Sequence, residues 1–71
     1  MIIKEIATIS FCDGESGTEA VAIIRLCGDR MALAISIQDD GDLEILIDED
    51  TAQKLVAALS VGIDHIKANG T

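Results

Sequence analysis

The side chains that most often carry chemistry are few in this sequence, and they are not grouped as a catalytic site requires. His65 is the only histidine. Helical periodicity places it away from the apolar stripe of its segment, near Asp64 and Lys67, where a solvent-facing histidine is a simpler interpretation than a general base. The serines carry no nucleophile motif; they are Ser10, Ser16, Ser36 and Ser60. The sequence therefore predicts no catalytic residues and favours a non-enzymatic protein.

Two cysteines are present, and neither belongs to a Cys-x-x-Cys or Cys/His cluster of the kind that binds zinc. Thiols of a cytosolic chain are usually reduced. Cys12 lies at the end of the first predicted strand, and Cys27 lies at the far end of the second. Roughly seven residues of about 3.3 Å each separate the two cysteines along the sheet. We therefore expect no disulfide between them, since a bridge requires Cα atoms within about 7 Å of each other.

Two loops contain glycines and acids that could suggest ligand binding. Residues 13–17, Asp-Gly-Glu-Ser-Gly, do not form a phosphate loop, because the acids repel phosphate and no lysine follows. Residues 39–42, Asp-Asp-Gly-Asp, are rich in oxygen but lack the spaced ligands and terminal glutamate of an EF-hand loop. Three interpretations of the acids in this part of the chain compete: a structural role, attraction of a basic partner, and calcium binding. Calcium binding is the weakest of them, and the sequence predicts no metal and no cofactor.

The charge of the chain is large and unevenly distributed. Thirteen acidic residues against five basic ones give a net charge of −8, which disfavours direct binding to nucleic acid. Between Met31 and Gln53 there are seven acids and no lysine or arginine. Either these acids form turns, begin a helix and guard a sheet edge, or they attract a basic protein partner. The candidates for the partner surface are Asp39, Asp40, Asp42, Glu44, Glu49 and Asp50.

The chain has 71 residues, which is enough for a single small domain, residues 1–71, and too few for two. Runs rich in β-branched residues predict three strands, at residues 2–11, 20–27 and 30–38. In the first run Glu5 interrupts the face that carries Ile3, Ala7, Ile9 and Phe11. Which face of that strand points inward therefore stays open.

Two turns predict the register of the strands that follow. Gly28-Asp29 is a link typical of a type II′ hairpin turn, and it pairs Leu26 with Met31, Ile24 with Leu33 and Ala22 with Ile35. Asp39-Asp40-Gly41 fits a three-residue hairpin loop that leads into a fourth strand, with Gly41 in the left-handed conformation. That loop pairs Ile37 with Leu43, Ile35 with Ile45 and Leu33 with Ile47.

The last third of the chain predicts a helix. Asp48 is a plausible N-cap, and a helix from about 49 to 68 carries Ala52, Leu55, Val56, Leu59, Ile63 and Ile66 at helical spacing. We expect this stripe to pack across the sheet face that carries Ile24, Leu26, Leu33, Ile35, Ile45 and Ile47. The predicted fold is α+β, a four-stranded antiparallel meander followed by one C-terminal helix packed on one face (ββββα).

Apolar residues remain once this core is assigned. Val21, Ile23, Ala34 and Leu46 fall on the other sheet face, where an antiparallel sheet is normally polar. Scattered surface apolar residues are one interpretation. We favour self-association through these four residues, as a homodimer, because a core of this size is marginal by itself.

The first residues, Met1 to Glu5, place charges where a signal peptide needs an apolar run, and no stretch approaches about 18 apolar residues. The sequence therefore predicts a cytoplasmic protein with no membrane contact. The leading hypothesis is an acidic, homodimeric interaction protein that binds a basic protein. Within this class, a phage-type anti-defence inhibitor of a nucleic-acid-binding machine fits the size and charge best. The alternative is a structural or regulatory subunit that docks the apolar sheet face left open by the helix on a larger protein, and a small enzyme is third.

Overall fold

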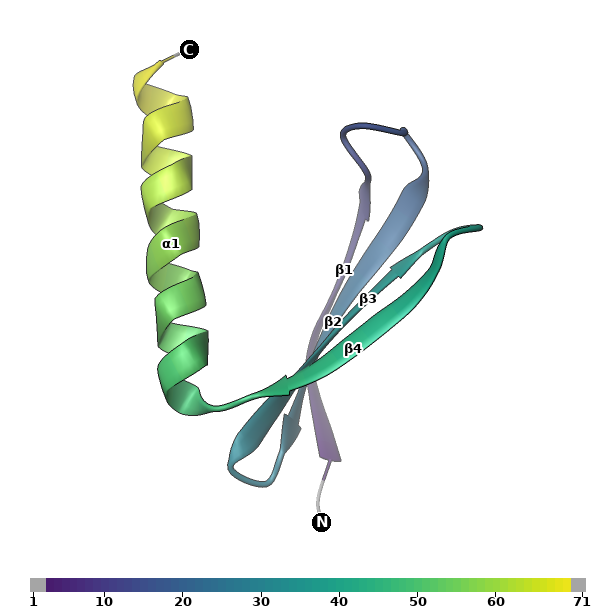
Figure 1. Ribbon diagram of the computed structural model, residues 1–71, viewed down its shortest axis with the longest axis vertical. Coiled ribbons are helices and arrows are strands. Elements are labelled where there is room, and N and C mark those ends of the chain that lie inside the picture. Colours follow the sequence, from purple (N-terminus) through teal and green to yellow (C-terminus); the bar gives the residue numbers. More distant parts are fainter. Residues whose placement is uncertain (1–2, 70–71) are drawn as a thin grey trace.

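The computed structural model describes residues 3–69 and consists of one antiparallel sheet and one helix (Figure 1). The strands are β1 (Ile3–Cys12), β2 (Glu19–Cys27), β3 (Arg30–Ile37) and β4 (Gly41–Ile47), followed by α1 (Glu49–Ala68). The strands lie in the order β1-β2-β3-β4, so each pairs with its neighbour in sequence. The predicted ββββα order is confirmed.

The β2–β3 hairpin has the predicted turn and register. Gly28 has φ +63°, as the first central position of a type II′ turn requires. Cys27 lies opposite Arg30, and the pairs Leu26–Met31, Ile24–Leu33 and Ala22–Ile35 form as predicted.

The β3–β4 hairpin has a different register from the predicted one. Ile37 pairs with Gly41 instead of Leu43, so the loop consists of residues 38–40. Asp39 takes the left-handed conformation with φ 72°, which a short polar side chain tolerates, and Gly41 has φ 100°. The turn closes with a 3.0 Å hydrogen bond from the Asp40 N–H to the Ile37 carbonyl. The error is two residues, so every β4 side chain keeps its predicted face.

A bulge in β1 resolves the ambiguous face of the first strand. Glu5 lies opposite Arg25, whereas Ala7 lies opposite Ile24, so Ile6 is an extra residue in the ladder. The bulge turns Glu5 to the face that carries Arg25. Downstream of it, Ala7 and the residues that alternate with it lie on the face of Ile24.

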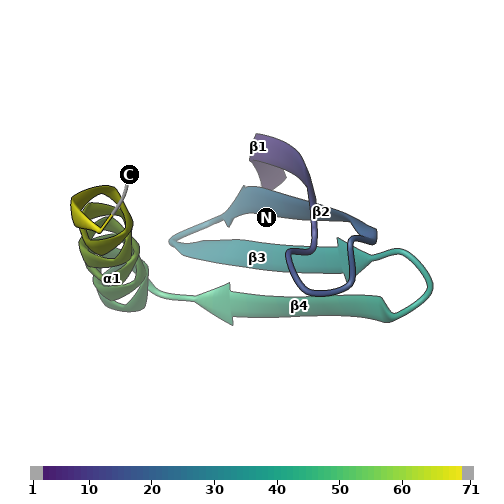
Figure 2. The same cartoon turned by 90° about the horizontal axis from the view of Figure 1, so that it is seen from above.

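Helix α1 begins directly after β4 and meets the sheet only near its own start. The Asp48 side chain caps it by accepting the Thr51 N–H at 2.9 Å. The helix contacts the sheet chiefly at β3. Figures 1 and 2 show the rest of α1 standing beyond the end of β4, beside the sheet and not across it. The helix therefore starts on the predicted face but covers much less of it than a helix laid across four strands would.

The folded chain buries very little. The buried hydrophobic residues are Ala20, Ala32 and Ala52, and no large side chain in the described part of the chain is fully buried. Within residues 3–69, no helix is both long and apolar enough to cross a membrane. The fold thus brings apolar residues together on surfaces instead of enclosing them.

Candidate interaction surfaces

One face of the sheet is apolar across all four strands. Residues directly opposite each other in neighbouring strands share a face, so the register defines it. The large residues of this apolar sheet face are Ile9, Phe11, Ile24, Leu26, Met31, Leu33, Ile35, Ile37, Leu43, Ile45 and Ile47. Ile9, Leu43 and Ile45 are 51%, 62% and 43% exposed. Lys4, opposite Leu26, is the one charged residue that the register of the described strands places on this face.

The apolar stripe of α1 is exposed as well. Ala52 is buried, but Leu59 and Ile66 are 67% and 73% exposed. The residues of this helix stripe are Ala52, Leu55, Val56, Leu59, Ile63 and Ile66. Sequence reasoning identified these residues and assigned them to a core. The structure leaves most of them open to solvent.

A cavity joins the two apolar surfaces where α1 leaves the sheet. It measures about 240 Å³ and is lined only by apolar residues, among them Ile24, Leu33 and Ile47 from the sheet and Ala52, Leu55 and Leu59 from the helix. It is open to solvent, since Leu59 in its lining is 67% exposed, so its apolar lining lacks the contacts that close packing supplies. The start of α1 and the sheet therefore do not complete a core by themselves.

The opposite sheet face carries the four residues predicted for self-association. Ile23 lies directly opposite Ala34, while Val21 and Leu46 lie nearby on the same face. Leu46 is 63% exposed and the other three are half-buried. Polar contacts surround them: Arg25 pairs with Glu44 at 3.0 Å, and the Ser36 hydroxyl donates to Asp42. This face mixes apolar and polar groups, as a solvated face does.

The six predicted acidic candidates lie along β4, in its leading turn and in the first helical turn. β4 is an edge strand, so its acids line an open edge of the sheet. Four of the six have local partners, since Asp42 and Glu44 bind Ser36 and Arg25, Glu49 accepts from Gln53 at 3.0 Å, and Asp50 pairs with Lys54 at 3.1 Å. No side-chain partner within residues 3–69 is seen for Asp39 or Asp40.

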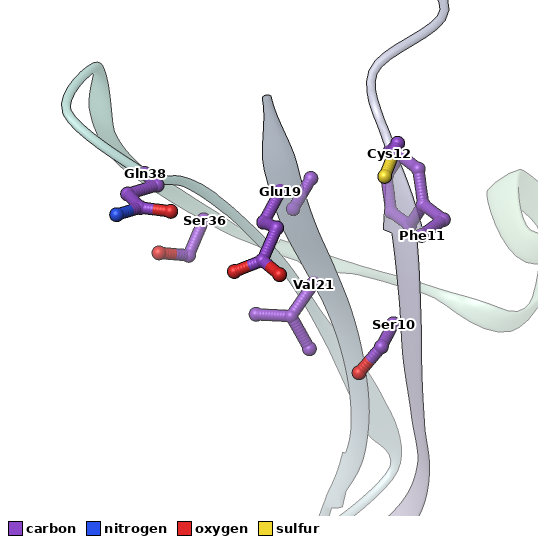
Figure 3. A pocket seen from close by; sticks show the side chains of 8 residues that line it. Ser10, Phe11, Cys12, Glu19, Val21, Ser36 and Gln38 are labelled. Atoms are coloured by element: carbon purple, nitrogen blue, oxygen red, sulfur yellow. The ribbon is translucent and has the colours of Figure 1, made fainter. Parts of the chain in front are cut away.

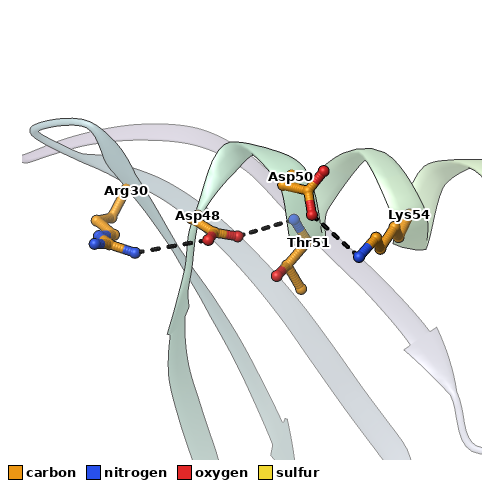
Figure 4. Close-up of polar contacts among 5 residues, drawn as sticks. All are labelled: Arg30, Asp48, Asp50, Thr51 and Lys54. Carbon is orange, nitrogen blue, oxygen red and sulfur yellow. Dashed lines mark hydrogen bonds and ion pairs between the residues drawn. The ribbon is translucent and has the colours of Figure 1, made fainter.

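The junction between β4 and α1 has its own polar network (Figure 4). Hydrogen bonds from the Thr51 side chain and then from its backbone lower the pKa of Asp48 below its ordinary value of 3.8. The Arg30 guanidinium lies 4.0 Å from the other Asp48 oxygen. Asp48 thus contacts both the first turn of α1 and a residue of β3.

The β1–β2 loop contains a turn that is closed by hydrogen bonds to a side chain. Asp13 accepts the Ser16 hydroxyl at 2.7 Å and the Ser16 N–H at 3.1 Å. These hydrogen bonds, the hydroxyl first, lower the pKa of Asp13. The sequence analysis placed a loop at residues 13–17 but did not predict these hydrogen bonds, although an aspartate three residues before a serine is a signal for them.

An open hollow of about 530 Å³ lies near the end of the sheet that carries Cys12 (Figure 3). Ser10, Val21 and Ser36 project into it from the mixed face, beside Glu19. Cys12 is free and exposed, and Cys27 is free and half-buried. They lie at opposite ends of the β1–β2 pair, which is the separation predicted from the strands. For the described chain, no group of three or more His, Cys, Asp or Glu side chains is arranged to hold a metal ion.

Comparisons of the chain with known protein families, with curated proteins and with solved structures found no match.

Proposed function

We propose that this is a non-enzymatic interaction protein that self-associates through its apolar surfaces and binds a basic protein through its acidic edge. The exposed apolar sheet face carries this proposal. An apolar surface that crosses four strands and continues along a helix is a common mark of a protein interface. Isolated exposed apolar residues would need no such explanation, but these form one continuous surface joined at the α1 cavity.

The acidic edge supports the second half of the proposal. The chain carries a net charge of −8, and the six acidic candidates lie at an open sheet edge and its two flanks. A field of one sign steers association with a cationic cleft. A protein that binds nucleic acid has such a cleft. Occupying it is how we propose this protein acts, as an inhibitor of a nucleic-acid-binding machine, with the cytoplasm as its compartment.

A subunit that docks its apolar sheet face on a larger protein is the second candidate function. The exposure of Leu43 and Ile45 favours it. The two candidates differ in their salt dependence. Binding through the acidic edge weakens as salt screens the charges, whereas burial of apolar surface is little affected by moderate salt.

The experiment compares two charge-neutralised variants. A partner is first captured from host extract with the unchanged protein and identified by mass spectrometry. Association is then timed at low and at physiological salt for the variant with Asp42→Asn and Glu44→Gln. We expect its association rate at low salt to fall by roughly two- to tenfold and its salt dependence to flatten, because steering is lost. The thermal stability should stay level or rise.

The matched control removes the same charge elsewhere. Glu5→Gln with Glu15→Gln neutralises two acids of β1 and its following loop, at the other edge of the sheet. This control should change association much less. An unchanged association rate in the Asp42/Glu44 variant, or an equal loss of association rate in both variants, would show that the acids of this edge have a purely structural role.

A further inference from the structure

We propose that the apolar sheet face of each chain is covered by helix α1 of a second copy, so that two copies exchange their helices reciprocally. The inference rests on the self-association proposed above and names its geometry: the helix stripe of one copy, Leu55 to Ile66, lies on the strands of the other.

The surface area of a single chain supports a second copy as the occupant. The chain exposes 5632 Å², whereas a folded monomer of 7.5 kDa exposes only about 4,200 Å². The excess is roughly 1,400 Å² per chain, or about 2,800 Å² for two, which lies within the range of obligate homodimer interfaces. Two copies that hide this excess from each other would each reach an ordinary degree of burial.

The chain's own helix is not placed to provide that burial. A single residue, Asp48, separates β4 from α1, with φ −88° and ψ 175°. Its side chain holds the first turn of α1 and faces Arg30 (Figure 4). To swing α1 across its own sheet, the chain would have to change the backbone dihedral angles at this one-residue junction and separate Asp48 from Arg30. The stripe beyond Leu59 therefore needs a surface from another chain.

The two surfaces match in length and in chemistry. The 20 residues of α1 rise about 30 Å at roughly 1.5 Å each. The eight residues of β3 extend about 26 Å at roughly 3.3 Å each. The helix stripe contains no charged residue. Among the described residues, Lys4 is the one charged residue on the apolar sheet face. Contact between them buries no carboxylate, so the net charge of −8 stays on other surfaces.

Reciprocal exchange also gives a closed assembly. Each chain offers one helix and one sheet face, so a twofold axis satisfies both at once and leaves no further copy to add. Packing of sheet on sheet would cover the strands but leave both helix stripes exposed. Exchange is the arrangement that covers the two surfaces together.

The test is disulfide trapping between chains of different mass, with Cys12→Ser and Cys27→Ser in both. One chain carries Ile63→Cys in the helix stripe, and the other carries Ile35→Cys at the centre of the apolar sheet face. The two chains are refolded together, oxidised with diamide and separated without reductant. We expect a linked pair that contains one chain of each kind. In a chain that carries both substitutions, the links should join two chains.

Ala57→Cys, on the side of α1 away from the stripe, replaces Ile63→Cys as the matched control and should link poorly. Light scattering of the unchanged protein gives the second readout, with a dimer expected. Leu59→Asp should weaken that dimer by more than about tenfold, because it buries an unpaired charge in the interface. Leu59 is 67% exposed in the single chain, so the substitution removes little of the chain's own packing, at the rim of the α1 cavity. Ile23→Asp on the mixed face should weaken the dimer less.

The outcomes separate this inference from the proposed function. A particle of one chain's mass would overturn both the exchange and the proposed self-association. A dimer in which Ile63→Cys links no better than Ala57→Cys would overturn the exchange alone. A dimer that Ile23→Asp dissociates and Leu59→Asp does not would also overturn it, and would assign self-association to Val21, Ile23, Ala34 and Leu46.

Discussion

At the scale of single residues, Asp48 joins the sheet to the helix. Its side chain accepts the Thr51 N–H at 2.9 Å and lies 4.0 Å from the Arg30 guanidinium. Both contacts favour the ionised carboxylate, as does its place at the positive end of the helix dipole. Because the pKa of Asp48 is lower in the folded protein than its ordinary value of 3.8, ionisation of this group stabilises the fold.

The stability that Asp48 contributes should depend on pH. It is fully present above a pH of about 3.8 and is lost as pH falls through the lower pKa of the folded protein. Asparagine also caps helices but does not titrate in this range. We expect the melting temperature of the wild type, relative to Asp48→Asn, to fall between about pH 6 and about pH 2. Circular dichroism at a series of pH values measures it.

The control for this titration is Asp50→Asn, which removes a neighbouring carboxylate that pairs with Lys54 instead of the helix backbone. Asp48→Ala, which removes the cap at every pH, should melt below Asp48→Asn at neutral pH. A difference between wild type and Asp48→Asn that stays constant with pH would contradict a role for the charge of Asp48.

At the scale of elements, turns and one bulge decide which side chains reach the apolar sheet face. The turn at Gly28 sets the β2–β3 register, and the bulge after Glu5 moves Glu5 off that face and places Lys4 on it. The β3–β4 turn shifts β4 by two residues from the predicted register, so Ile35 pairs with Leu43. Side chains alternate along a strand, so a shift of two leaves the chemistry of the face unchanged.

The turn at Gly28 offers a test of how strongly the hairpin depends on its backbone. A Cβ added there meets no other atom within 4 Å, so the cost of Gly28→Ala comes from φ +63° alone. We expect a loss of about 1–2 kcal/mol in the free energy of unfolding. Gly28→Asn should lose less, since asparagine is, with glycine and aspartate, one of the residues that dominate the positive-φ positions of type I′ and II′ turns. Urea denaturation at a fixed chain concentration measures both, and equal losses would rule out backbone strain as the cause.

At the scale of the whole molecule, the fold exposes its large apolar residues instead of enclosing them in a core. Three alanines are the buried hydrophobic residues of the described range 3–69, and the extents of 44 × 31 × 15 Å describe a flat body with a projecting helix (Figures 1 and 2). Hydrophobic burial is the main favourable term in folding. A chain that buries so little by itself should gain most of its stability by association.

Stability should therefore depend on protein concentration. For a dimer that unfolds as it dissociates, tenfold dilution removes about 1.4 kcal/mol. The melting temperature should fall by roughly 3–5 °C per tenfold dilution. Calorimetry over a range of concentrations measures this shift. The dimer linked through Ile63→Cys and Ile35→Cys is the control, because its melting should not depend on concentration. A concentration-independent melting temperature of the unlinked protein would contradict stabilisation by association.

Local patterns in the sequence were sufficient for the elements and for the faces of most strands. Gly28-Asp29 predicted the hairpin register, because a two-residue turn with glycine first leaves few alternatives. Asp48 and the spacing of Leu55, Leu59 and Ile66 predicted the helix and its bounds. The same alternation identified the apolar residues that form the candidate surfaces, although it assigned most of them to a core.

Tertiary structure decided what the patterns left open. The bulge at Ile6 depends on pairing with β2, and the left-handed Asp39 depends on how β3 and β4 meet. Apolar periodicity shows that the helix stripe must be covered, but it contains no information about which surface covers it. The backbone at Asp48 directs α1 away from its own sheet. Direction in space, set at one residue between strand and helix, is what turned a predicted core into an exposed apolar surface.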